Sequence, residues 1–169
     1  MNTPTDLLDP ELRLDGDGAE VRFTQTWGTD VADLWDAVTD PARLARWFAE
    51  IVGTPRVGEE FGIRFDDGDV PRLTLRWCEE GVGYSFTWPM AQGPTEVDVE
   101  VHAEGPGRSR LVLTHRLLSR EKAPEYGAGW AAYVAHLGDH LSGDAPGDWW
   151  AQFGAARTRL AERIAALGG

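Results

Sequence analysis

The chain has few features that would serve disulfide formation, membrane insertion or charge-driven binding to phosphate groups. Cys78 is the single cysteine among 169 residues, so no internal disulfide can form, as expected in the reducing cytoplasm. No apolar run approaches the length of a membrane span, and the N-terminus lacks the basic and apolar regions of a signal peptide. The net charge of −12 disfavours contact with nucleic acids and anionic lipids. We therefore expect a cytoplasmic protein that neither binds nucleic acid nor inserts into membranes.

Motifs for nucleophilic, nucleotide and metal chemistry are also missing. The sequence contains no Gly-x-Ser-x-Gly elbow, no Gly-x-x-x-x-Gly-Lys phosphate loop and no Gly-x-Gly-x-x-Gly turn. His136 and His140 lie four positions apart, a spacing that suits zinc, but Asp139 points away from them on a helix and no third ligand is assignable. The acidic turn at 66–69 lacks the spacing of a calcium loop. We predict neither a metal nor a cofactor.

The composition is that of one ordinary globular domain. Hydrophobic residues make up 42% of the chain and charged residues 26%, and the length is too short for two independent domains to be expected. We place a flexible lead-in at residues 1–10 and a single domain at residues 11–169. The eight tryptophans are the unusual feature, because a large ring with one donor suits cores, interfaces and ligand cavities alike.

Two short helices are expected in the first third of the chain. Residues 31–38 place apolar side chains at i, i+3, i+4 and i+7, which gives the first helix one apolar face. Asp40 and Pro41 then form a start signal, an N-cap carboxylate followed by a residue that suits the first helical position. The second helix would bury Leu44, Trp47 and Phe48.

The middle of the chain alternates apolar and polar residues with period two, as half-buried strands do. The predicted strands are Leu12–Leu14, Val21–Trp27, Phe61–Phe65, Leu73–Cys78, Tyr84–Trp88, Val97–Ala103 and Leu111–Arg116. Turn residues rich in Gly, Asp and Pro separate them, as in an antiparallel meander. The last third changes to helical period, with a long apolar stripe from Tyr126 to Leu141 and a further helix over about 146–167.

This order of elements predicts an α+β fold in which a curved antiparallel sheet of about six or seven strands wraps around the long helix. The inner face of the sheet and the long helix would enclose a cavity, and the second of the two short helices would close one end of it. The residues expected to line the cavity are Trp47, Phe65, Trp77, Tyr84, Trp88, His115, Trp130 and Tyr133. Trp35 is assigned to the core. Arg64, Arg76 and Glu100 alternate to the opposite face unless a strand slips by one residue.

Four segments carry a resemblance to a known family. The run Val31 to Phe48 resembles the motif VWxALTDPxxLxxWF of bacterial homologues of the activator of the heat-shock protein 90 ATPase. Arg110–His115 resembles a late strand of that family, Gly129–Trp130 the start of its long helix, and Gly147–Trp150 its C-terminal extension. The resemblance spans about residues 12–165. It implies the helix-grip fold of the START-like (SRPBCC) superfamily.

The same resemblance implies several kinds of activity, because relatives include lipid carriers, plant ligand-binding proteins, polyketide aromatase/cyclases and a co-chaperone. The favoured hypothesis is non-enzymatic binding of a small hydrophobic or aromatic molecule in the cavity. A cyclase or hydrolase-like enzyme is the first alternative, with His115 as the one candidate catalytic group. A structural His115 bonded to a backbone carbonyl is the more common situation. A co-chaperone-like module with a protein partner is the second alternative, and a homodimer stays open.

Overall fold

A computed structural model describes residues 8–168 of the chain. Residues 1–7 of the expected lead-in lie outside this range. The described residues form one eight-stranded antiparallel sheet with the order β1-β2-β8-β7-β6-β5-β4-β3. The strands are β1 (Glu11–Asp15), β2 (Gly18–Trp27), β3 (Glu50–Val52), β4 (Glu60–Arg64), β5 (Arg72–Glu79), β6 (Gly83–Trp88), β7 (Thr95–Ala103) and β8 (Ser109–Ser119). The α+β class and the antiparallel sheet are confirmed, and the strand beyond the expected number is β3.

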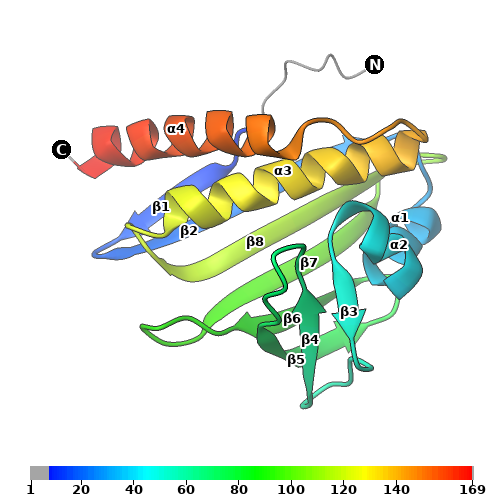
Figure 1. The fold of residues 1–169 in the computed structure, drawn as a ribbon. Coiled ribbons are helices and arrows are strands. Elements are labelled where there is room, and N and C mark those ends of the chain that lie inside the picture. Colours follow the sequence, from blue (N-terminus) through cyan, green and yellow to red (C-terminus); the bar gives the residue numbers. More distant parts are fainter. Residues whose placement is uncertain (1–7, 169) are drawn as a thin grey trace.

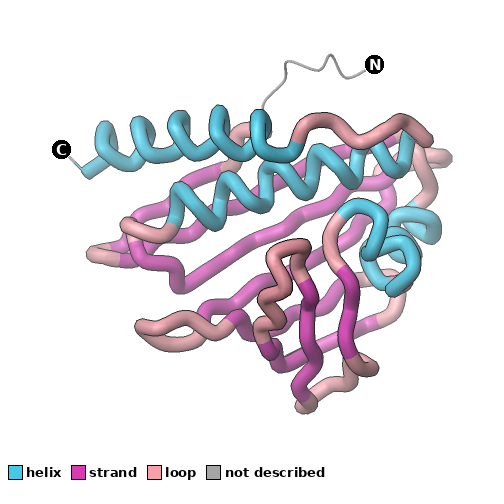
Figure 2. Tube along the Cα trace, viewed as in Figure 1, coloured by secondary structure: helices cyan, strands magenta, loops and turns pink. Residues whose placement is uncertain are grey.

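Four helices complete the fold, and they are α1 (Val31–Thr39), α2 (Pro41–Trp47), α3 (Ala123–Ser142) and α4 (Trp149–Gly168). Figure 1 shows the sheet curving around α3, with α1 and α2 near one end of α3 and α4 running alongside it. The tube view in Figure 2 shows the same layers, one of helices and one of strands. Within residues 8–168, no helix combines the length and the apolar character needed to cross a membrane.

The junction of α1 and α2 differs in detail from the sequence expectation. Asp40 ends α1, because its N–H bonds to the carbonyl of Asp36 at 2.8 Å, and its own carbonyl accepts the N–H groups of Arg43 and Leu44. Its carboxylate makes no capping hydrogen bond. Pro41 does occupy the first turn of α2 as expected. The shared Asp40 therefore joins the two helices through its backbone alone.

The long helix lies close to both the sheet and α4 because small residues occupy the contact. A Cβ added to Gly127 in α3 would lie 2.7 Å from Cδ1 of Leu160 in α4 and 3.4 Å from Cγ1 of Val21 in β2. Real Cβ atoms do not approach other atoms as closely as 2.7 Å, so a larger residue at position 127 would force the Leu160 side chain to move. The α3 helix ends at Gly143, whose φ of 74° is left-handed, as in many helix C-termini.

Candidate functional site

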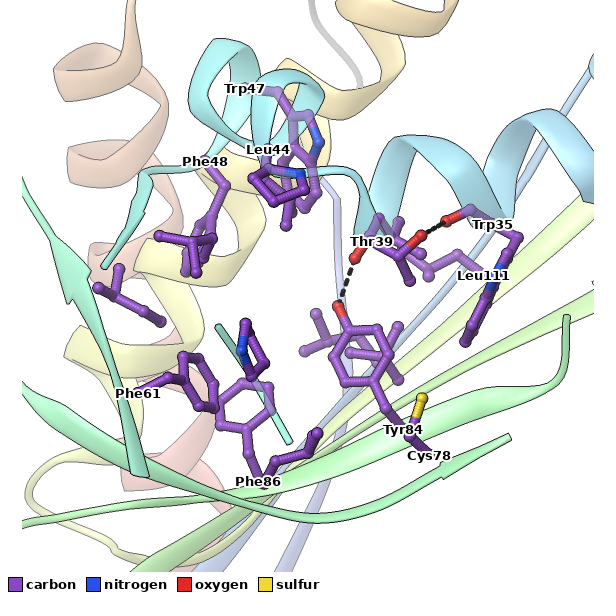
Figure 3. Close-up of a pocket in the computed structure, with 18 of the residues that line it drawn as sticks. Trp35, Thr39, Leu44, Trp47, Phe48, Phe61, Cys78, Tyr84, Phe86 and Leu111 are labelled. Atoms are coloured by element: carbon purple, nitrogen blue, oxygen red, sulfur yellow. Dashed lines mark hydrogen bonds between the residues drawn. The ribbon is translucent and has the colours of Figure 1, made fainter. Parts of the chain in front are cut away.

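A cavity of about 340 Å³ lies between the sheet, α1, α2 and one residue of α3. Its wall is almost entirely apolar and aromatic (Figure 3). The lining residues are Trp35, Val38, Thr39, Pro41, Leu44, Trp47, Phe48, Ile51, Pro55, Phe61, Ile63, Leu75, Cys78, Tyr84, Phe86, Val99, Leu111, Leu113 and Trp130. All of them belong to the described part of the chain, and none carries a charge. Such a space excludes ions, because charge in an apolar enclosure is costly without a partner.

Three polar side chains of the wall bond to the last turn of α1. Thr39 Oγ1 donates to the carbonyl of Trp35 at 2.6 Å, and Trp47 Nε1 donates to the carbonyl of Ala37 at 2.9 Å. Tyr84 Oη donates to the carbonyl of Val38 at 2.8 Å. The last carbonyls of a helix lack intrahelical partners. Side chains from α2 and β6 therefore satisfy carbonyls near the end of α1, and this end of the helix becomes part of the cavity wall.

Tyr84 is a neutral phenol at physiological pH. Burial raises the pKa of its hydroxyl well above the ordinary value, and the nearby Cys78 acts in the same direction. Burial also raises the pKa of the Cys78 thiol, with a contribution from Glu80. Cys78 is exposed while lining the cavity, so it lies where the cavity meets solvent. Neither group adds a charge to the wall.

Seven of the eight expected cavity residues divide into two groups in the structure. Trp47, Tyr84 and Trp130 line the cavity. The others on the inner side, Phe65, Trp88, His115 and Tyr133, instead form an aromatic cluster next to it, with ring centroids 5.9 to 6.4 Å apart in the pairs Trp88 with Trp130, Phe65 with Trp88, Trp88 with His115 and Phe65 with Tyr133. Tyr133 belongs to α3, and the other three rings pack against aromatic side chains of that helix rather than facing open space.

Two tryptophans differ in different ways from their sequence assignments. Trp35 packs against the core as expected, but it also lines the cavity, with its ring edge-on to Tyr84 at a centroid distance of 6.2 Å. Trp77 does not line the cavity, and it is 42% exposed. Helical periodicity could not show that the core-facing side of α1 also borders a cavity. For Trp77, the expected alternation of side chains fails within β5.

A β-bulge in β5 reverses the side-chain alternation. Leu75 pairs with Phe86, but the next paired residue is Trp77 with Ser85, so Arg76 has no partner in β6. An unpaired residue shifts every following side chain to the other face. Trp77 therefore lies on the outer face, where its ring is 3.1 Å from the position of a Cβ on Gly83. Cys78 takes the inward position beside the cavity instead.

His115 is fully buried, and both of its ring nitrogens are bonded. Trp130 Nε1 donates to His115 Nδ1 at 3.0 Å, and His115 Nε2 lies 2.8 Å from Thr95 Oγ1. The hydroxyl of Thr95 donates to the carbonyl of Trp88 at 3.0 Å, so the proton between Thr95 and the ring belongs to Nε2. Burial lowers the pKa of His115 to about 3. The imidazole is thus neutral and joins α3 to two strands, through side chains rather than the expected backbone carbonyl.

His136 and His140 bind different partners. His140 Nε2 accepts a hydrogen bond from Arg43 Nε at 3.1 Å, whereas His136 Nε2 lies 3.0 Å from the carbonyl of Gly147. Arg43 also contacts Asp33 and a second carboxylate of α1, each at 2.9 Å. No group of three or more potential metal ligands occurs among residues 8–168. The pair therefore connects helices and loops in this structure.

The elements that enclose the cavity match a known protein family. A family model described as activator of Hsp90 ATPase homolog 1-like protein matches residues 28–142. The chain belongs to this family. The matched region of the chain includes every residue that lines the cavity, whereas α4 lies outside it. The START-like helix-grip resemblance seen in the sequence is confirmed.

Solved structures of bacterial proteins share this fold. CalU16 from Micromonospora echinospora is 23% identical, with 92% of this chain and 97% of that chain covered and a TM-score of 0.76. The protein encoded by BPP1335 from Bordetella parapertussis is 27% identical, with 96% and 95% covered and a TM-score of 0.74. EF2215 from Enterococcus faecalis, a conserved protein of unknown function, is 17% identical, with 94% and 91% covered and a TM-score of 0.78. No curated protein matches the sequence.

Proposed function

We propose that the protein binds a small, uncharged, apolar molecule in the cavity without transforming it. The observation that carries this proposal is an apolar cavity of about 340 Å³ that reaches solvent near Cys78. An apolar cavity of about 150 Å³ is large enough to hold benzene. A space of this size therefore suits a molecule of about two or three rings, and the aromatic wall would contact its faces and edges.

The chemistry of the wall favours binding over catalysis. General acid or base catalysis needs a titratable group within hydrogen-bond reach of the reacting atoms. His115, the candidate for a cyclase or hydrolase-like reaction, is not part of the wall, and Trp130 and Thr95 occupy its two nitrogens. Tyr84 keeps its proton because burial raises its pKa. The groups that border the cavity are thus suited to contact rather than to proton transfer.

Cys78 supplies a native reporter for the binding experiment. It is the single cysteine of the chain and lies where the cavity wall meets solvent, so a ligand bound beside it should slow its reaction with a thiol reagent. We expect naphthalene to slow this reaction in a saturable manner and to raise the melting temperature over the same concentration range, because ligands that bind only the folded state stabilise it.

A cavity-filling variant and a surface variant provide the controls. Ile51 is half-buried on the short strand β3 and lines the cavity, so Ile51→Trp should occupy the space and abolish the effect of naphthalene. Val57 is 58% exposed and does not line the cavity, so Val57→Trp should bind naphthalene as the unaltered chain does. The proposal is wrong if neither naphthalene nor larger neutral ring compounds change the labelling rate or the melting temperature.

A further inference from the structure

One corner of the cavity combines two hydroxyl groups with the C-terminal end of a helix. The hydroxyls of Tyr84 and Thr39 lie on the same side of the cavity in Figure 3, next to the last turn of α1. Each hydroxyl has a single proton and two lone pairs. Both protons are already committed, to the carbonyls of Val38 and Trp35 at 2.8 and 2.6 Å. Toward a ligand, these two oxygens can therefore only accept hydrogen bonds.

The rest of the wall offers nothing that would hold an anion. Thr39, Trp47 and Tyr84 direct their own protons at the carbonyls of α1, so their donors are not available to a ligand. The lone pairs of the two hydroxyls attract the positive hydrogen of a ligand hydroxyl and repel a carboxylate. Within the described residues, no lysine, arginine or histidine lines the cavity.

We propose that the cavity selects neutral ring compounds that carry a hydroxyl donor, with the donor directed at Tyr84 Oη or Thr39 Oγ1, and that it rejects carboxylates. This inference rests on the proposed binding function and adds the ligand class and orientation to it. A ligand that offered only acceptors would depend on the indole N–H of Trp35 and the weakly donating thiol of Cys78, both from residues that line the cavity. Recognition through the hydroxyl oxygens favours ligands with a donor, whereas recognition through donors of the wall would favour ligands with an acceptor. Ligands of equal size therefore distinguish the two modes of binding.

Four naphthalene derivatives of similar size separate these preferences through their effect on Cys78 labelling. We expect 2-naphthol to bind about 3- to 10-fold more tightly than naphthalene, the range that one net hydrogen bond supplies. We expect 2-methoxynaphthalene, which has an acceptor and no donor, to bind no more tightly than naphthalene. We expect 2-naphthoate to bind at least about tenfold more weakly than naphthalene, because the apolar wall and the lone pairs of the two hydroxyls both disfavour its charge.

Variants of the two hydroxyls test the orientation. In the double variant Tyr84→Phe with Thr39→Val, the ratio of 2-naphthol to naphthalene affinity should fall to about 1 while naphthalene affinity is retained. Tyr126→Phe, at a tyrosine outside the cavity wall, should leave the ratio unchanged.

The outcomes distinguish this inference from the function on which it rests. If 2-naphthol binds no more tightly than 2-methoxynaphthalene, or if the double variant keeps the full preference, the donor selectivity is wrong while binding stands. If none of the neutral compounds slows Cys78 labelling or raises the melting temperature, the binding function itself fails. Circular dichroism of each variant establishes that the comparison is made between folded proteins.

Discussion

At the scale of single residues, His115 and Tyr84 show how hydrogen bonding decides the use of a buried polar group. His115 Nδ1 accepts a hydrogen bond from Trp130, and His115 Nε2 donates one to Thr95, so neither nitrogen is free for a ligand. Tyr84 spends its proton on the carbonyl of Val38 and keeps lone pairs beside the cavity. His115 therefore connects α3 to the sheet, whereas the Tyr84 oxygen can still accept a hydrogen bond from a ligand.

The buried state of His115 predicts how stability depends on pH. Its pKa is lowered to about 3 by burial, while the ordinary value is 6.5. Below 6.5 the unfolded chain takes up a proton that the folded protein refuses, so the stabilisation is present above 6.5 and lost as the pH falls. The free energy of unfolding should decrease by about 2 kcal/mol between about pH 7 and about pH 5. Urea unfolding at several pH values measures this slope.

Two histidine variants test the assignment of that slope. His115→Gln should be less stable at neutral pH and should lose most of the pH dependence. The remainder belongs in part to His140, whose pKa is also lowered, by burial first and then by Arg43 and Arg46. His102→Gln, at a more exposed histidine, should keep the slope of the unaltered chain. An unchanged slope in His115→Gln would contradict the assignment.

At the scale of elements, α2 forms one wall of the cavity, and Arg43 fixes this helix to its neighbours. The helix contributes Leu44 and Trp47 to the wall. From the same helix, Arg43 bonds to Asp33 in α1 and to His140 in α3. Arg43 retains its charge, since hydrogen bonds to Asp36 and Asp33 outweigh the effect of burial and raise its pKa. These bonds join three helices at one end of the cavity.

Removing the Arg43 contacts should weaken the packing of α2 against α1 and α3. We expect Arg43→Met, which keeps the length of the side chain without its charge, to lower the free energy of unfolding by about 1 to 2 kcal/mol. Naphthalene should then protect Cys78 less well from thiol reagents, because the cavity opens more often. Arg46→Met alters an exposed arginine of the same helix and should change neither quantity appreciably. Equal effects of the two substitutions would show that the contacts of Arg43 do not fix α2 in place.

The strands show how far local patterns predict an element. Seven of the eight strands follow from alternation, and their predicted ranges overlap the observed ones. The missed strand, β3, has three residues, too few for a period of two to be recognised. The bulge at Arg76 has no local sequence signal that we can identify, and it moved Trp77 outward and Cys78 inward. One unpaired residue thus changed the composition of the cavity wall.

At the scale of the whole molecule, the net charge of −12 opposes the compact state. Dissolved salt screens repulsion between exposed charges, with a screening length of about 10 Å at about 0.1 M. We expect an increase in NaCl from about 20 mM to about 200 mM to stabilise the fold by about 1 kcal/mol, which corresponds to a rise of about 2 to 4 °C in melting temperature. Thermal unfolding followed by circular dichroism measures it.

Potassium chloride at the same ionic strength is the control for this experiment, because screening does not depend on the identity of the cation. A melting temperature that falls or stays constant with added salt would mean that favourable ion pairs, such as those of Arg43 and Arg163, outweigh the repulsion. The same measurement in the presence of naphthalene separates the effect of salt on the fold from its effect on binding.

The sequence by itself determined the α+β class, the order of the elements, the helix-grip family and the apolar character of the inner faces. These properties follow from periodicity and from short motifs, which act over a few neighbouring residues. Only the tertiary structure decided which rings border the cavity, where Cys78 lies and which polar groups keep free lone pairs. These depend on an unpaired residue in β5, on where α3 crosses the sheet and on side chains that bond to the end of α1, contacts between segments far apart in the chain.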